Sequence, residues 1–139
     1  MSKEITVKPE FYTFNQNNSG GSFETSLGAE KDNMYGPWGI SCYVIIEAND
    51  LTHALVRAEE IGLYFEDGMD CPCCGNRWST YADDADVPSV YGQPVTDTLD
   101  EFNAIRTGVG AKGYDLYRWV EGPQGYVHYL NGDVKAVLA

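Results

Sequence analysis

Four closely spaced residues, at positions 71 to 74, have the types and spacing that most directly suggest chemistry. They open the run CPCCGNRW (71–78), in which Cys71 and Cys74 bracket a Cys-Pro-x-Cys-Gly turn. Proline fixes a backbone angle of such a turn and glycine admits a left-handed residue after it, so both sulfurs point toward one place. Structural zinc takes four nitrogen or sulfur ligands in a tetrahedron. The run therefore predicts a zinc-knuckle-like turn that supplies two ligands and needs two more.

Three sets of residues would complete this zinc site. The first is Cys42 together with one of the two histidines, His53 or His128. The second uses Cys73 as a third sulfur, and the third joins two chains in a homodimer, each giving one turn. Because the sequence holds no second CxxC pair, it excludes an autonomous zinc ribbon.

The same turn also allows two interpretations without a metal. It is either a tight turn with reduced thiols packed under Trp78, or a redox site that resembles the CxxC of thiol oxidoreductases. The redox enzymes place this motif at a helix N-terminus, whereas Gly75 and Asn76 are poor helix formers. The sequence favours the reduced turn or the zinc site over redox chemistry.

Aromatic residues beside arginines suggest a different kind of site. Arg77 adjoins Trp78, and Tyr117, Arg118 and Trp119 follow one another. A guanidinium and an indole suit the phosphate and the base of a nucleotide-like ligand. Aromatic residues at strand spacing are also typical of a core, and both interpretations remain open.

The charge of the chain excludes one large class of function and suggests another. The net charge is −12, and eleven acidic residues lie between Glu59 and Glu101 against one base, Arg77. This balance argues against direct binding to nucleic-acid phosphates. The acids predict either a solvated surface or a face that binds a basic partner. The candidate contact residues are Asp67, Asp70, Asp83, Asp84 and Asp86.

Length and composition predict a single domain over residues 1–139. Residues 15–35 are rich in Asn, Gly and Ser and predict a long flexible loop. No signal peptide and no apolar run long enough for a membrane span is visible. We therefore expect a cytoplasmic protein with no membrane association.

The clearest elements lie next to each other in the first half of the chain. Residues 39–48 predict a central strand with Cys42, Val44 and Ile46 on one face. A helix with Asp50 as N-cap follows, and Gly62 ends it. Its apolar stripe comprises Leu51, Ala54, Leu55, Ala58 and Ile61.

The second half predicts a short helix and a β region. Thr98 and Glu101 form a capping box at the start of the helix. Three strands over 114–120, 125–130 and 133–138 predict a C-terminal antiparallel meander, with Asn-Gly in its last turn. The order of elements predicts an α+β fold, a mainly antiparallel sheet with one or two helices packed on one face.

One segment resembles part of a known group of proteins. The run "EANDLTHALVRAEEIGLYFEDGMDCPCCGNRW" (47–78) is similar to small uncharacterised proteins of tailed bacteriophages. In those proteins a strand and a helix lead into a Cys-x-Cys-Cys-Gly-x-Arg-Trp turn. The resemblance implies a phage context, and for a phage-encoded protein the compartment would be the host cytoplasm.

These observations favour a non-enzymatic role. With two histidines and no serine in a nucleophile elbow, the sequence offers no hydrolase triad. We expect an acidic phage-type accessory protein whose acidic face binds a basic surface of a host protein or of a component of host defence. The alternatives are a protein that sequesters a nucleotide-like ligand and an enzyme that uses thiols or zinc at the CPCC turn.

Overall fold

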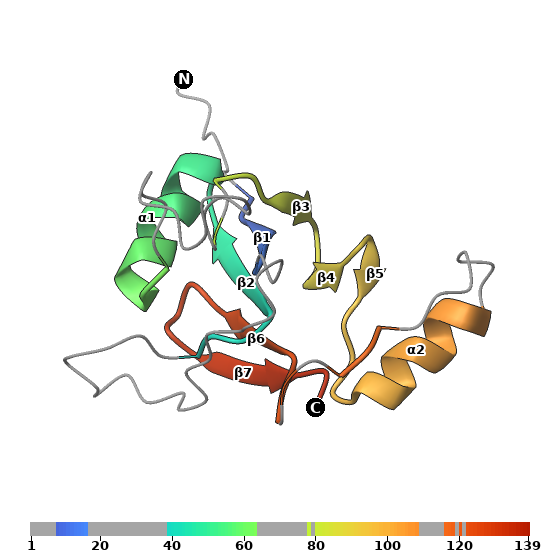
Figure 1. The fold of residues 1–139 in the computed structure, drawn as a ribbon. Helices are drawn as coiled ribbons and strands as arrows, with labels where there is room; N and C mark the ends of the chain where they lie inside the picture. The colour runs from blue at the N-terminus through green and yellow to red at the C-terminus, as the bar shows by residue number, and fades with distance from the viewer. Residues whose placement is uncertain are drawn as a thin grey trace, which may run out of the picture.

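The computed structural model of the chain describes residues 8–16, 39–63, 78, 80–108, 116–118, 120 and 122–139. Within these residues lie a five-stranded sheet of order β3-β1-β2-β6-β7, a separate two-stranded hairpin and two helices (Figure 1). The elements in chain order are β1 (Glu10–Asn15), β2 (Tyr43–Ala48), α1 (Leu51–Ile61), β3 (Asp83–Ala85), β4 (Ser89–Val90), β5 (Gln93–Pro94), α2 (Leu99–Gly108), β6 (Gly125–His128) and β7 (Val134–Val137). All strand pairs are antiparallel except β2 with β6. The α+β class and the mainly antiparallel sheet are confirmed.

Strand β2 is the central strand of the sheet, as its apolar residues on both faces predict. Val44 and Ile46 belong to one buried cluster, whereas Tyr43 and Ile45 belong to another on the opposite face. The alternation had predicted Cys42 on the same face as Val44, but it lies with Tyr43 and Ile45 on the opposite face. The reason is that Cys42 sits in a bend before the strand begins, where the alternation of faces does not yet apply.

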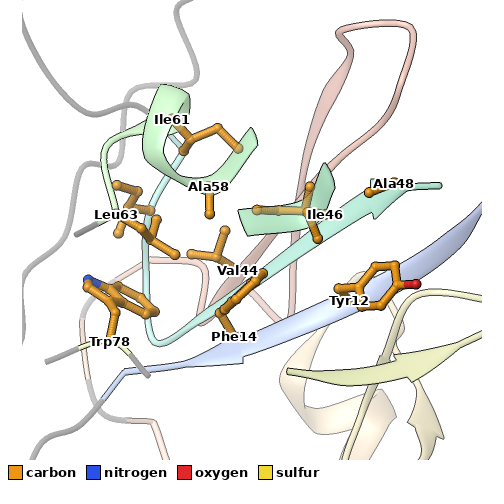
Figure 2. Close-up of a cluster of buried hydrophobic side chains, with 11 residues drawn as sticks. Tyr12, Phe14, Val44, Ile46, Ala48, Ala58, Ile61, Leu63 and Trp78 are labelled. Carbon is orange, nitrogen blue, oxygen red and sulfur yellow. The ribbon is translucent and has the colours of Figure 1, made fainter. Parts of the chain in front are cut away.

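Helix α1 covers the first face of the sheet, and the sequence predicts both of its ends correctly. The Asp50 carboxylate accepts a hydrogen bond from the His53 amide at 2.8 Å, and Gly62, with φ of 126°, donates its amide to Ala58 and Glu59. Figure 2 shows the packing between this helix and the strands. The α1-side core comprises Tyr12, Phe14, Ile40, Val44, Ile46, Ala48, Ala54, Ala58, Ile61, Leu63 and Trp78.

Helix α2 covers the other face, so the two helices lie on opposite sides of the sheet (Figure 1). Leu99 and Phe102 are buried there with Ile45 and Val127. Hydrogen bonds between the chain just before α2 and the last residues of the protein fix its position, including Leu99 N to Ala139 O at 3.0 Å. The sequence had predicted helices on a single face. These backbone contacts join distant segments and leave no local sequence pattern.

The C-terminal antiparallel unit is a strand pair in the described part of the chain. β6 and β7 form the predicted hairpin around Asn131-Gly132, with Gly132 at φ of 95°. Leu116 to Arg118, within the first segment of the expected meander, belong to no strand. The Asn103 side chain instead holds the Leu116 backbone through two hydrogen bonds, of 2.9 and 2.7 Å.

The first two residues of the segment 15–35, which was predicted to be a loop, belong to β structure. Asn15 is the last residue of β1, and Gln16 forms an antiparallel bridge with Trp78. Residues 17–35 lie outside the described residues. The bridge ties Trp78, the last residue of the CPCCGNRW run, directly to the end of β1.

Candidate functional site

Many of the predicted site residues fall outside the part of the chain that the structure describes. These are Asp67, Asp70, Cys71, Cys73, Cys74, Arg77 and Trp119. The zinc, thiol and nucleotide sites that depend on them therefore stay predictions.

The structure does not bring Cys42 and His128 together. Cys42 lies before Tyr43, which pairs with Gly125, whereas His128 pairs with Ile46 at the other end of β6. The separation is on the order of 10 Å along the strands. The two side chains also belong to opposite faces, since Val127 lies in the α2-side core with Cys42 and neighbouring strand residues alternate.

Each of these two residues is already occupied by structural contacts. His128 is 1% exposed, and its Nε2 donates to the Gly39 carbonyl at 2.7 Å. Burial lowers the pKa of His128 to about 4, with Arg57 adding to this effect, although the hydrogen bond to Gly39 raises it. Burial raises the pKa of the Cys42 thiol to about 11. The Cys42 thiol donates to the Gln124 side-chain oxygen at 3.9 Å, so in the described fold both side chains take part in buried structural contacts.

The aromatic candidates are separated as well. Trp78 is 1% exposed and packs in the α1-side core beside Phe14 and Leu63 (Figure 2). Tyr117 is exposed and Arg118 donates to the Gly122 carbonyl at 3.1 Å. The Trp78 ring therefore belongs to the core and offers no accessible face for a planar ligand.

The acidic candidates, by contrast, gather on an edge strand. β3 pairs with β1 and lies at one end of the sheet order, with Tyr12 opposite Asp84 and Thr13 opposite Asp83. Asp83, Asp84 and Asp86 are exposed. We call these three residues and Glu10 the acidic edge.

Glu10 is the member of this group that the sequence did not reveal. It starts β1, far from the acidic stretch in the chain, but the register brings it beside β3. A hydrogen bond with Asp84 raises the pKa of Glu10, and burial and the charges of Asp84 and Asp86 raise it further, while Lys8 lowers it. The shift indicates that the carboxylates are crowded enough to disfavour the full negative charge.

Large apolar and aromatic side chains border the acidic edge. Tyr81 is 72% exposed, Tyr91 is 53% exposed and Val87 is also exposed. The Tyr81 hydroxyl donates to the Asp83 carboxylate at 2.7 Å, and that hydrogen bond raises the pKa of Tyr81. Tyrosines among charged residues are typical of protein interfaces, where they supply contact area with a polar tip. The sequence had shown only an irregular segment here, because strands of two or three residues leave no periodic pattern.

Two further features, a cluster of metal-binding side chains and a membrane-spanning helix, are absent from the described residues. These residues contain no group of three or more Cys, His, Asp or Glu side chains arranged to hold a metal ion. None of the helices in the described ranges combines the length and the apolar character that crossing a membrane requires.

Comparisons with known proteins identify a family without a known activity. No curated protein and no solved structure has significant similarity to the chain. One family model, described as a domain of unknown function (DUF7296), matches residues 9–138. The match spans both helices, the whole sheet and the acidic edge, and the chain therefore belongs to the DUF7296 family.

Proposed function

We propose that this chain is a non-enzymatic binding protein whose acidic edge contacts a basic surface of a partner protein. The observation that carries the proposal is the crowding of Glu10, Asp84 and Asp86, which raises the pKa of Glu10. In the described part of the chain, no salt bridge compensates Asp83, Asp84 or Asp86. The negative charge of this edge is left for a partner to neutralise.

Crowded carboxylates cost free energy in the isolated protein. Like charges held close together repel, and a cationic partner surface would convert this repulsion into attraction. Complementary charge also raises the association rate and disfavours partners of the wrong charge. A surface with these properties suits selective binding of a basic protein.

The resemblance of residues 47–78 to proteins of tailed bacteriophages supports the choice of partner. In that setting the partner is a bacterial host protein or a component of host defence, and binding takes place in the host cytoplasm. The acidic edge lies outside the resembling segment, so the two arguments are independent.

Affinity capture from a bacterial lysate, at low and high salt, tests the proposal with two matched variants. Asp84→Asn/Asp86→Asn neutralises two charges of the acidic edge, whereas Glu59→Gln/Glu60→Gln neutralises two exposed charges on the last turn of α1. We expect the same basic protein with the wild-type chain and the α1 variant, and its loss with the edge variant or at high salt. Capture that is equal for all three proteins, or that ignores ionic strength, would overturn the proposal.

The two other functions stay predictions. Sequestration of a nucleotide-like ligand depends on Arg77 and Trp119, and a thiol or zinc enzyme depends on Cys71 and Cys74. All four lie outside the described residues. Calorimetry with a panel of nucleotides tests the first, and a measurement of bound metal tests the second.

A further inference from the structure

A hollow of about 330 Å³ lies between β3 and the β4–β5 hairpin. The hairpin sits against β1 on the side of the sheet that α1 does not cover (Figure 1). A hydrogen bond of 2.7 Å from the Thr13 hydroxyl to the Ser89 carbonyl joins them. The lining residues are Thr13, Asp83, Asp84, Ala85, Ser89, Tyr91 and Gly92.

The strand register decides which carboxylate this hollow receives. Asp83 is opposite Thr13, and Asp84 is opposite Tyr12. Because side chains alternate between faces, Asp83 points to the hollow side with Thr13. Asp84 points to the other face, where it shares a hydrogen bond with Glu10. The hollow therefore contains the carboxylate of Asp83, and Asp84 lines it without directing its carboxylate there.

The two aliphatic hydroxyl groups in the wall, those of Thr13 and Ser89, have already donated their protons. Thr13 Oγ1 donates to the Ser89 carbonyl at 2.7 Å, and Ser89 Oγ donates to the Val87 carbonyl at 2.8 Å. A hydroxyl whose proton is committed has only acceptor capacity left, and an ionised carboxylate accepts only. The hollow thus offers a ligand the hydrogen-bond acceptors of Asp83, Thr13 and Ser89. This lining favours a ligand group that is rich in hydrogen-bond donors.

Tyr91 adds an aromatic surface to the same hollow. It occupies the first central position of the two-residue β4–β5 turn with φ of 51°, and Gly92 follows with φ of 78°. Positive φ at both positions defines a type I′ turn, which favours Asn or Gly at the first of them. A large side chain is strongly disfavoured there, yet the turn displays the Tyr91 ring, which contacts Tyr43 edge-on with centroids 6.0 Å apart.

From these features we infer that the hollow receives a guanidinium group, supplied by an arginine of the basic partner. A guanidinium carries five N–H donors, pairs with carboxylates and stacks on aromatic rings. Asp83 supplies the charge, Thr13 and Ser89 supply neutral acceptors and Tyr91 supplies the ring. The inference rests on the proposed function for the source of the arginine, but the chemistry of the hollow can be tested without that partner.

The test titrates the full chain with short neutral-capped peptides and follows backbone amide NMR shifts. One peptide contains a central arginine, a second contains lysine and a third contains citrulline, which keeps the shape of arginine without its charge. Agmatine provides a free guanidinium compound for comparison. We expect saturable millimolar binding of the arginine peptide, with shifts confined to the neighbourhood of Thr13 and to residues 83–92, weaker binding of lysine and none of citrulline.

Paired variants assign the effect to the hollow. Asp83→Asn should weaken the arginine peptide at least about tenfold, because hydrogen bonds to charged groups are the strong ones. Asp84→Asn makes the same chemical change one residue along and should change the affinity less than about threefold, since its carboxylate faces away. Tyr91→Asn should weaken binding while keeping the turn.

Each outcome separates this inference from the proposed function. Equal shifts with citrulline, or equal effects of Asp83→Asn and Asp84→Asn, would overturn the hollow as a guanidinium site and leave the acidic edge untouched. Arginine binding at the hollow without capture of a basic protein would support the site and overturn the proposed function. Tighter binding of agmatine than of the peptide would support the site but overturn a protein as the source of the group.

Discussion

Asp83 and Asp84 are neighbours in sequence and have different surroundings. The pairing of β3 with β1 sends Asp83 toward Thr13 and the hollow, and Asp84 toward Tyr12 and Glu10. The Asp83 carboxylate lies near neutral acceptors and accepts a hydrogen bond from the Tyr81 hydroxyl. The Asp84 carboxylate lies beside the carboxyl group of Glu10. At the residue scale, the candidate site is therefore two surfaces with one sign of charge, and single Asp→Asn changes separate them.

His128 leads to a prediction about stability in acid. Burial lowers the pKa of His128 to about 4. The hydrogen bond to the Gly39 carbonyl opposes this shift, and the charge of Arg57 adds to it. In the unfolded chain the same side chain takes up a proton near pH 6.5. The contribution of the neutral His128 to the free energy of unfolding should therefore be fully present above pH 6.5. It should be lost as the pH falls from 6.5 to 4, which lowers the free energy of unfolding by up to about 3 kcal/mol.

Denaturant unfolding across this pH range measures that contribution. His128→Gln keeps an amide donor for the Gly39 carbonyl but does not titrate, so its stability should lose less between pH 6.5 and 4 than that of the wild-type chain. The difference between the two proteins removes the background of the carboxyl groups, which titrate in the same range. Parallel pH curves for the two proteins would contradict a buried, neutral His128.

At the element scale, the β4–β5 hairpin is a turn built around an unfavourable residue. Tyr91→Asn replaces a strained residue by one that prefers this turn, but it removes the ring contact with Tyr43. The first change stabilises and the second destabilises by about 0.5–1.5 kcal/mol. We expect the free energy of unfolding to stay within about 1 kcal/mol of the wild-type value. A loss above about 2 kcal/mol in urea unfolding would mean that Tyr91 has a structural role beyond this contact.

Helix α1 offers a second prediction at this scale. Asp50 caps the helix through its carboxylate and the His53 amide. Asp50→Ala should lower the free energy of unfolding by about 1 kcal/mol, whereas Asp50→Ser should retain most of the cap. Urea unfolding of the three proteins checks the order, and equal losses for Ala and Ser would show that the cap contributes little.

At the scale of the whole molecule, the sequence predicts the elements with strong local patterns. The central strand around Val44 and helix α1 carry clear apolar periodicity, and Asn131-Gly132 marks its hairpin. β3, β4 and β5 are too short to show a pattern, although they carry the candidate site. The side of the sheet that α2 covers and the approach of Glu10 to Asp84 depend on pairing between distant segments. Asp83, Asp84 and Asp86 were therefore predictable as candidate residues, but Glu10 and the division of the site into two surfaces were not.

The geometry of the whole sheet also sharpens the zinc prediction. Cys42 and His128 lie on opposite faces and at different registers. If the CPCC turn binds zinc, Cys42→Ser and His128→Gln should both leave the zinc content of folded protein unchanged. Metal analysis under reducing conditions would give about one zinc per chain for a site within one chain and about one half for a site between two chains. A ratio below about 0.3 would contradict a structural site. Loss of zinc in one variant would show that its side chain is a ligand, and loss in both variants would contradict the separation of the two side chains.

The uneven charge of the molecule leads to a prediction about salt. With a net charge of −12 the folded chain repels itself, so added sodium chloride should raise the free energy of unfolding. Asp84→Asn/Asp86→Asn and Glu59→Gln/Glu60→Gln each remove two negative charges, but their neighbourhoods differ. Asp84 and Asp86 crowd Glu10, whereas Glu60 lies close enough to the Arg57 guanidinium to counteract, by its charge, the lowering of the Arg57 pKa by burial.

Urea unfolding at low and high salt compares the two variants directly. Removing repulsion at the acidic edge should stabilise the edge variant at low salt and reduce its response to salt. The α1 variant loses an attraction with Arg57, so it should not gain stability and should keep a larger response. Because the net charge of the two variants is the same, a difference between them comes from local arrangement. Identical responses would mean that the acidic edge experiences only the average charge of the molecule, and would remove the energetic basis for a binding surface there.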